Sequence, residues 1–233
     1  MLGPADYLLW LVGFSLEASV VVCALYRKDF LKYLSLCGYM LCAALVNCGQ
    51  FLCIQKFGFG SSQYRYCYYY TESILTIAMF CVIIQLYQHV FIEMSVSRYI
   101  RGAGAILLLA TAFFSYAVVR ENKDHLTSRF VVELGQNLHF CGVVLTYLLW
   151  GAILKLRETR TRLIQLVLAL GVYFSATAGV YALRNLFPGL QPSFLRWVPP
   201  VIGAWLPLAW AYTFYKVPED ARLATARLLA RAR

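Results

Sequence analysis

Residues 163–183 read LIQLVLALGVYFSATAGVYAL and contain no charged side chain. A helix of this length matches the hydrocarbon core of a bilayer, which is about 30 Å thick and is crossed by roughly 20 helical residues. The run does not alternate between apolar and polar residues, as a transmembrane strand would. A backbone in lipid also needs hydrogen-bond partners within its own segment. The stretch therefore predicts a membrane-spanning helix.

Six other stretches have the same character and are separated by charged connectors such as Arg27-Lys28-Asp29. The seven predicted spans are 6–26, 33–54, 68–92, 102–119, 129–154, 163–183 and 197–215. The sequence thus predicts an all-α fold, a polytopic membrane bundle of seven helices within residues 1–216. A short basic tail helix is expected over residues 217–233, because Pro218 and two acidic residues suit a first helical turn and arginines suit a last one.

The composition excludes several classes of protein. Of the 233 residues, 61% are hydrophobic and only 14% are charged, and the mean hydropathy is +0.64. A soluble domain has about 25% charged residues and needs them to cover its core. A soluble monomer, a disordered chain and a small disulfide-rich secreted domain are therefore excluded, and a multi-pass protein of the cell membrane remains.

The distribution of Lys and Arg predicts the orientation of the bundle. Fourteen of these residues fall on the side of the connector at 27–32, and seven fall on the other side. Because cytoplasmic loops are enriched in Lys and Arg, we expect the N-terminus outside and the C-terminus in the cytoplasm. The net charge of +10 then fits anionic lipid of the inner leaflet, and nucleic acid is not an expected partner.

Polar side chains inside the spans are candidates for a binding site, because such groups are costly in a membrane. Glu17 lies near the middle of the first span, and Glu133, Gln136 and Asn137 share one face of the fifth. We expect a polar cavity open to the outside, although hydrogen bonding between helices would explain the same residues. The predicted ligand-binding set is Glu17, Asn47, Gln50, Glu72, Glu133, Gln136, Asn137 and Tyr181.

A second group of polar residues follows the inner end of the third span. We expect it to form a structural network near the lipid headgroups, in which Glu93 pairs with an arginine that follows it. The members of this predicted inner network are Gln85, His89, Glu93, Arg98 and Arg101.

The sequence gives no support for a metal, a cofactor or a recognisable catalytic centre. The eight cysteines include no CxxC pair, and GxSxG and HExxH motifs are absent. A retinal Schiff base would need a lysine within a span, and His89 and His139 differ in depth by roughly 15 Å, which disfavours a haem held by both. Cys53 and Cys67 both lie near the outer face, and whether they form a disulfide stays open.

Several features carry a resemblance to known classes of membrane protein. Seven spans, an outside N-terminus and Ser97-Arg98-Tyr99 after the third span resemble the plan of heptahelical receptors, without their acidic residue before Arg98. The stretch LWGAILKLRETRTRLIQLV, residues 149–167, is similar to compact bacterial seven-helix proteins without an assigned activity. The chain also resembles the seven-helix sensory portion of some histidine kinases, which implies an output through a separate partner protein.

The leading functional hypothesis is a receptor-like protein that binds a small or lipid-like ligand from outside, or a membrane partner subunit of a larger complex. A permease built from three helices, one linking helix and three more is the alternative, because the connectors after the first and fifth spans, and after the second and sixth, are similar. A structural subunit whose buried polar groups pair with one another is the third.

Overall fold

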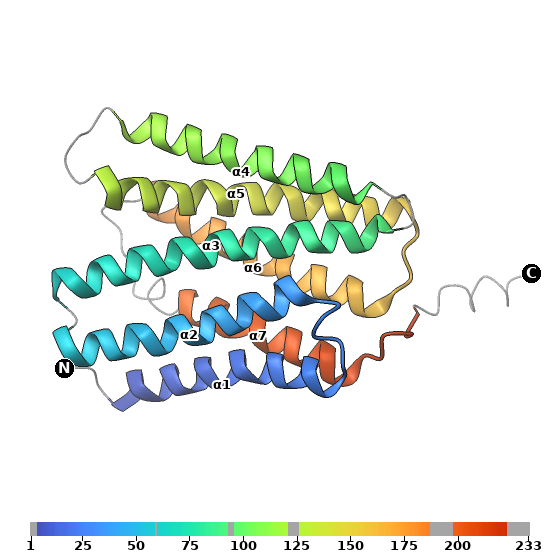
Figure 1. Ribbon diagram of the computed structural model, residues 1–233, viewed down its shortest axis with the longest axis horizontal. Coiled ribbons are helices and arrows are strands. Elements are labelled where there is room, and N and C mark those ends of the chain that lie inside the picture. Colours follow the sequence, from blue (N-terminus) through green and yellow to red (C-terminus); the bar gives the residue numbers. More distant parts are fainter. Residues whose placement is uncertain (1–3, 59, 93–95, 121–125, 187–197, 223–233) are drawn as a thin grey trace, which may run out of the picture.

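The computed structural model describes residues 4–58, 60–92, 96–120, 126–186 and 198–222, and these residues form seven helices (Figure 1). The helices are α1 (Pro4–Tyr26), α2 (Leu34–Phe57), α3 (Ser62–Val90), α4 (Ser97–Val119), α5 (Leu126–Lys155), α6 (Thr161–Leu186) and α7 (Val198–Lys216). The predicted all-α fold and its number of helices are confirmed for the described residues.

Five of these helices, α2 to α6, are long and apolar enough to cross a membrane. In α1, the apolar segment Trp10–Tyr26 is shorter than the other five. In α7, Pro207 interrupts a helix of 19 residues. The chain is therefore an integral membrane helical protein with five candidate spans, and spans through α1 and α7 remain predictions.

The α2–α3 connection shows why α3 begins six residues before the predicted span. Gly58 ends α2 with a φ of 81°, a conformation that glycine adopts without steric cost. Ser61 then caps α3, since its hydroxyl oxygen accepts a hydrogen bond from the backbone N–H of Tyr64 (3.1 Å). Tyr64 and Tyr66, which precede the predicted span, thus lie in the first turns of the helix.

Six helices form a closed ring, and α4 lies outside it. Neighbours around the ring are α1, α2, α3, α5, α6 and α7, and α7 packs back against α1. Helix α4 packs mainly on α5 and lies along one edge of the bundle (Figure 1). The ring gives the molecule an interior that six helices share.

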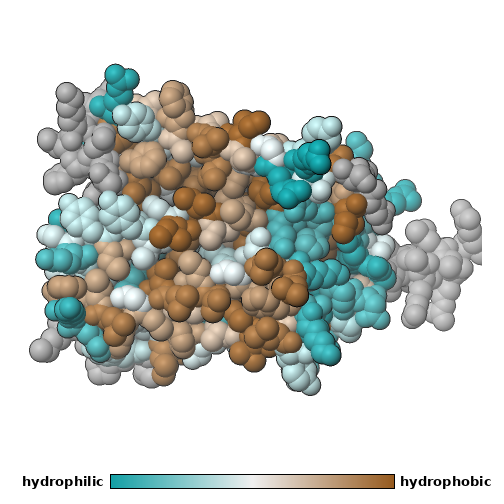
Figure 2. Space-filling model, viewed as in Figure 1, coloured by the Kyte–Doolittle hydropathy of each residue, from teal (hydrophilic) through white to brown (hydrophobic). Residues whose placement is uncertain are grey.

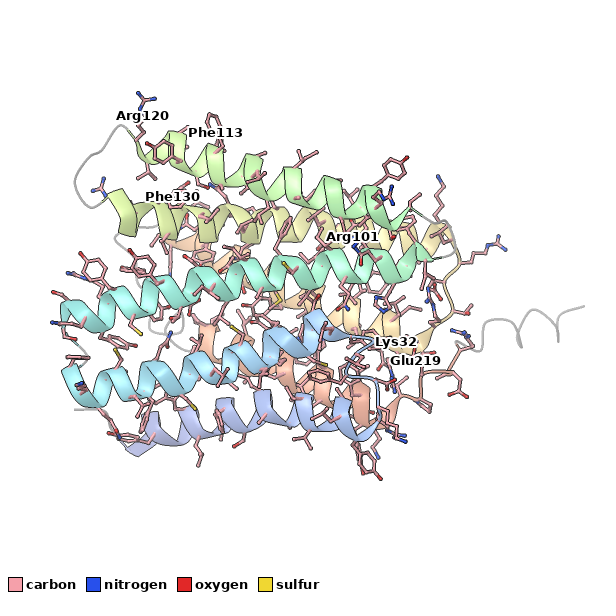
Figure 3. The ribbon with its side chains drawn as sticks, viewed as in Figure 1. Lys32, Arg101, Phe113, Arg120, Phe130 and Glu219 are labelled. Carbon is pink, nitrogen blue, oxygen red and sulfur yellow. The ribbon has the colours of Figure 1, made fainter. Side chains whose placement is uncertain are left out.

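The two ends of the bundle are named here by one residue each. Helices α1, α3, α5 and α7 begin at the Phe57 end, and α2, α4 and α6 begin at the opposite end, the Arg162 end. Figure 3 places Arg120, Phe113 and Phe130 toward the Phe57 end, and Lys32 and Glu219 together at the Arg162 end.

The surface has the polarity expected of a protein in a bilayer. Figure 2 shows a broad hydrophobic band across the middle of one face and hydrophilic side chains near the two ends, most densely at the Arg162 end. Large apolar side chains of α4 are exposed, among them Leu109, which is 69% exposed, and Phe113, which is 74% exposed. Contact with lipid acyl chains accounts for their exposure.

The core is densest in the half of the ring nearer the Arg162 end. Trp210 and Phe214 of α7 are fully buried there, together with Leu36 of α2, Leu86 of α3 and Leu166 of α6. All five belong to one cluster of buried residues, so this half of the interior is packed mainly with apolar groups.

The expected tail helix is not seen in the part of the tail that is described. Residues 217–222 form a turn, in which the Ala221 N–H donates to the Pro218 carbonyl (3.2 Å), and Arg222 forms an isolated antiparallel bridge with Arg160. The rest of the predicted tail, 223–233, lies outside the described residues. The expected first turn of a helix at Pro218 is therefore replaced by a turn held against the start of α6.

Candidate functional site

A polar cavity of about 170 Å³ lies inside the ring of six helices. Its polar lining comes from five different helices, with Glu17 on α1, Asn47 on α2, Glu72 on α3, His139 on α5 and Tyr173 on α6. Each of these residues lies 10 to 13 positions from the end of its helix at the Phe57 end. At 1.5 Å per residue the cavity is thus roughly 15–20 Å below that end, near the middle of a bilayer.

Glu17 is held by Asn47 across the α1–α2 contact. Both carboxylate oxygens of Glu17 lie 2.7 Å from Nδ2 of Asn47, which donates to them. The amide therefore satisfies part of the hydrogen-bonding capacity of the carboxyl group and brings no charge to it.

Glu72 has a different environment. Its carboxyl group lines the same cavity, and among the described residues it forms no hydrogen bond and no ion pair. A carboxyl group in apolar surroundings without such partners is costly. Glu72 is therefore the lining residue whose hydrogen-bonding capacity is least used.

His139 also lines the cavity. The side chain is only 7% exposed, and its Nδ1 lies 2.7 Å from the Gly135 carbonyl oxygen. Because a carbonyl oxygen accepts only, Nδ1 carries a hydrogen, and Nε2 of the neutral ring is left as an acceptor. The ring packs edge-on against Phe174 and Tyr181 at centroid distances of 5.8 and 5.5 Å.

Two tyrosines complete the wall. The side chains of Tyr39 on α2 and Tyr173 on α6 interact with each other across the ring. Tyr39 also packs edge-on against Trp210 at 6.3 Å, and Tyr173 lies beside His139 at 6.2 Å. Aromatic faces and phenolic oxygens therefore surround the carboxyl groups.

On the side of the Phe57 end, further polar residues lie between the cavity and the surface. Gln50 donates from Nε2 to the Thr71 hydroxyl oxygen (2.9 Å), which joins α2 to α3. Tyr181, one of the predicted ligand-binding residues, interacts electrostatically with both Glu72 and Arg184. These groups extend the polar region from the cavity toward the Phe57 end.

Three of the predicted ligand-binding residues lie at contacts of α5 with α4 and α6, outside this cavity. Asn137 donates to the Ser115 hydroxyl oxygen of α4 (3.0 Å) and lies 3.4 Å from the Glu133 carboxylate. Gln136 accepts from Asn185 of α6 (3.4 Å). Glu133 and Asn137 therefore belong to the contact between α5 and the peripheral helix α4, and none of the three lines the cavity.

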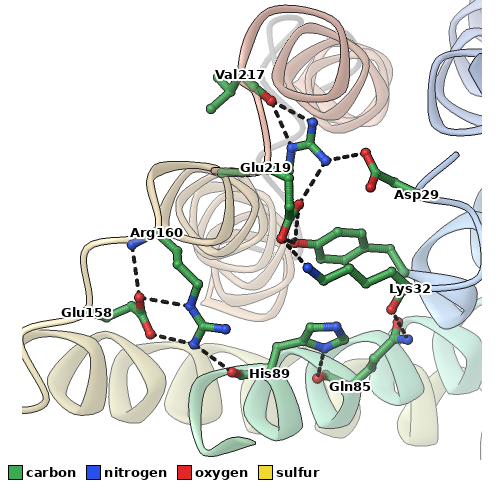
Figure 4. Close-up of polar contacts among 10 residues, drawn as sticks. Asp29, Lys32, Gln85, His89, Glu158, Arg160, Val217 and Glu219 are labelled. Atoms are coloured by element: carbon green, nitrogen blue, oxygen red, sulfur yellow. Dashed lines mark hydrogen bonds and ion pairs between the residues drawn. The ribbon is translucent and has the colours of Figure 1, made fainter. Parts of the chain in front are cut away.

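A network of charged residues around the buried Arg162 occupies the Arg162 end (Figure 4). The guanidinium of Arg162, which is 2% exposed, pairs with the carboxylates of Asp29 and Glu219 and donates to the Val217 carbonyl oxygen from Nε (2.9 Å) and Nη2 (2.7 Å). Lys32 forms an ion pair with Glu219. The network ties the α1–α2 connector and the segment after α7 to the first turn of α6.

At the Arg162 end, the pKa values of Tyr33 and Glu158 are shifted in the directions that keep Tyr33 neutral and Glu158 ionised. Burial and the Glu219 carboxylate raise the pKa of Tyr33 well above its usual range, so Tyr33 stays a hydroxyl and donates to Glu219 (3.3 Å). Hydrogen bonds from the Arg160 side chain lower the pKa of the Glu158 carboxyl group. Asp29 and Glu219 offset the charges of Arg162 and Lys32, and Glu158 offsets Arg160, so the network is balanced in charge.

Of the predicted inner network, the residues of α3 join this end of the molecule. Gln85 accepts from the Ser35 N–H (3.0 Å) and donates to the Lys32 carbonyl oxygen (3.2 Å), and the His89 ring stacks on Tyr33 at 5.0 Å. Arg98 and Arg101 are exposed and form no ion pair with a described residue. Glu93, their expected partner, lies outside the described residues.

Sequence reasoning missed the aromatic part of the site and the centre of the charge network. The cavity is lined by Tyr39, Tyr173 and His139. Tyrosine is common in these spans, and nothing in the sequence distinguishes Tyr39 and Tyr173 from the other tyrosines. By its charge, Arg162 is typical of a basic connector. Its position just inside α6, opposite acidic residues in two other connectors, was the signal that could have indicated a buried ion pair.

The described residues contain no group of three or more His, Cys, Asp or Glu side chains that could hold a metal ion. A scan against protein-family models, a search of curated proteins and a search of solved structures each found no match.

Proposed function

We propose that this chain is a seven-span membrane protein that binds a small polar molecule in its central cavity, with access from the Phe57 end. The observation that carries the proposal is the cavity itself, in which Glu72 and His139 Nε2 have no hydrogen-bond partner among the described residues. Buried polar groups in native proteins are generally satisfied. A bound molecule would supply the partners that the chain leaves out.

The packing below the cavity supports access from one side. Toward the Arg162 end the ring is filled by fully buried apolar side chains, including Leu86, Trp210 and Phe214, and the charge network lies beyond them. Toward the Phe57 end, polar residues such as Gln50 and Tyr181 continue from the cavity. The bundle is thus apolar on one side of the cavity and polar on the other, as we expect of a receptor-like protein that admits its ligand from one side. A purely structural subunit would have its polar groups fully paired.

The orientation is part of the proposal. Eleven described Lys and Arg residues lie at the Arg162 end, from Arg27 to Arg222, and five lie at the Phe57 end, from Lys56 to Arg184. By the enrichment of basic residues in cytoplasmic loops, the Phe57 end faces outward and the cavity receives its ligand from outside.

The test compares two glycine substitutions. Gly203 lines the cavity, and a Cβ atom at this exposed position has no neighbour within 4 Å, so we expect the ring of Gly203→Phe to reduce the space in the cavity. Gly151→Phe is the matched control, because Gly151 is exposed on α5 and also has open space around it. Small molecules retained by each purified protein are identified by mass spectrometry after solvent extraction. We expect a molecule that the wild type and Gly151→Phe retain and Gly203→Phe loses, whereas identical profiles for all three proteins would contradict the proposal.

A permease is the second candidate, and the division of the ring into two sets of three helices supports it. Helices α1 to α3 and α5 to α7 supply the two halves of the ring, and α4 lies outside as the link between them. Uptake of the retained molecule into vesicles that contain the purified protein distinguishes the two candidates. Accumulation inside the vesicles indicates transport, and binding without accumulation indicates a receptor.

A further inference from the structure

The charge of the cavity indicates what kind of molecule it accepts. Glu17 and Glu72 both line it, and no Lys or Arg is among the described residues that do. The ion pairs among the described residues all lie at the Arg162 end. Two carboxyl groups share a small space of low dielectric, where a second negative charge is strongly opposed and a positive charge is attracted.

The uncharged groups of the lining are also suited to a cation. Asn47 uses its Nδ2 on Glu17, so its carbonyl oxygen remains as an acceptor, and His139 Nε2 is a second acceptor. The aromatic side chains of Tyr39 and Tyr173 also line the cavity. Ammonium groups are recognised in proteins by acceptors of this kind together with aromatic faces, through hydrogen bonds and cation–π attraction.

The volume limits the size of the molecule. A space of about 170 Å³ equals the volume of roughly five or six water molecules at about 30 Å³ each. A short-chain amine fits this space, whereas a nucleotide or a lipid headgroup with its glycerol does not. Because the described residues contain no metal-binding group of three His, Cys, Asp or Glu side chains, a divalent metal ion is not the favoured occupant.

We propose that the cavity binds a small organic ammonium ion, with Glu72 as its main counter-charge and Glu17, held by Asn47, as the second. This inference rests on the proposed function, since it names the chemical class of the ligand for the same cavity. An ammonium group would give the Glu72 carboxylate the partner that it lacks within the described part of the chain, and would compensate the charge of the lining.

The test measures binding of n-propylammonium by isothermal titration to the full chain in lipid nanodiscs, with empty nanodiscs as the blank. Propionamide and propionate, which have a similar size and no positive charge, are titrated at the same ionic strength, as are sodium and potassium ions. We expect binding of n-propylammonium alone. Fluorescence is a second readout, because Trp210 packs on Tyr39 at the cavity wall.

Two matched variants locate the binding. Glu72→Gln removes the charge while keeping the shape, and we expect at least tenfold weaker binding of n-propylammonium. Glu133→Gln makes the same change in α5 at a carboxyl group outside the cavity, and we expect an unchanged affinity. Circular dichroism and size-exclusion chromatography confirm that both variants are folded, and Glu17→Gln replaces Glu72→Gln if the latter is not.

The outcomes separate this inference from the proposed function. Equal or tighter binding of propionamide or propionate overturns the ammonium inference and leaves a small-molecule site in place. If sodium or potassium binds and n-propylammonium does not, the proposal that the ligand is an organic ammonium ion is overturned. If Glu72→Gln and Glu133→Gln lose the same affinity for n-propylammonium, the placement of the binding site in this cavity is overturned. If no probe binds, the ammonium inference fails, and the comparison of Gly203→Phe with Gly151→Phe decides separately whether the cavity holds a molecule at all.

Discussion

The Glu17–Asn47 pair shows how a single amide makes a carboxyl group tolerable inside a membrane. Both oxygens of Glu17 accept from the same Asn47 nitrogen at 2.7 Å. Removing one partner of a buried hydrogen bond costs about 1–3 kcal/mol, because the other partner is left unsatisfied. We expect Asn47→Leu to lower the free energy of unfolding by about this amount.

A double-mutant cycle measures how much of that loss belongs to the pair. Glu17→Gln keeps an acceptor opposite Asn47, so we expect a smaller loss than in Asn47→Leu. The double variant should then lose less than the sum of the two single variants, since adjacent partners couple. The measurement is reversible unfolding in a denaturing detergent, and strict additivity would show that the two side chains do not interact.

Glu158 provides a prediction about pH outside the membrane spans. Its Oε1 accepts from Arg160 Nε at 2.9 Å, and Oε2 accepts from Arg160 Nη2 at 2.5 Å. The hydrogen bonds from Arg160 lower the pKa of Glu158 in the folded protein. The stabilisation is therefore fully present above the unfolded pKa of about 4.3 and is lost as the pH falls through the folded pKa.

Glu158→Gln tests this dependence, because the variant has no carboxyl group at 158 to titrate. We expect the wild type to be the more stable protein at neutral pH and the difference to shrink as the pH falls below about 4.3. Thermal unfolding monitored by circular dichroism over this pH range gives the two curves. The other carboxyl groups are the same in both proteins, so only the difference between the curves reports on Glu158, and parallel curves would contradict the prediction.

At the residue scale, hydropathy could identify costly side chains but could not give their partners. Glu17, Asn47 and Glu72 were expected in one cavity, and they do line one. Glu133 was expected there too, yet with Asn137 it turns toward α4. The spacing of residues fixes only which of them share a face of a helix, and the neighbour of that face is set by tertiary packing.

At the scale of single helices, the α2–α3 hairpin supplies a test of packing register. Cys53, near the end of α2, and Cys67, near the start of α3, have their thiols in contact. Both are free thiols in the structure. We expect a mild oxidant such as copper phenanthroline to join them in an intramolecular disulfide.

Mass spectrometry of the proteolysed, unreduced protein detects the linked peptides. Cys48 on α2 and Cys81 on α3 are exposed and have the same chemistry, so they serve as internal controls that should not cross-link to each other. Cys53→Ser should abolish the product. A mixture of disulfides without preference for 53–67 would show that the register of α2 against α3 differs from the one described.

Helix positions were predictable because an uninterrupted apolar run of about 20 residues is typical of a membrane-spanning helix. Helix ends were less predictable, since they depend on local caps and contacts. The hydroxyl cap at Ser61 extends α3 beyond its predicted span. Helix α6 begins at Thr161, so the buried Arg162 lies in its first turn, within a segment whose charge is typical of a connector. The closed ring with α4 outside was not predictable, because pairing between helices depends on the shapes of their surfaces.

For the whole molecule, the orientation in the membrane is the property on which access to the cavity depends. Five helices are candidate spans, and the excess of basic residues at the Arg162 end predicts that this end faces the cytoplasm. Gln63 at the start of α3 and Lys155 at the end of α5 are both exposed and lie at opposite ends of the bundle. In intact cells, a membrane-impermeant maleimide should label Gln63→Cys and leave Lys155→Cys unlabelled until the membrane is permeabilised. The wild type gives the background from its own cysteines. The reverse pattern would place the cavity entrance on the cytoplasmic side, and labelling of both variants in intact cells would contradict the odd number of spans between the two positions.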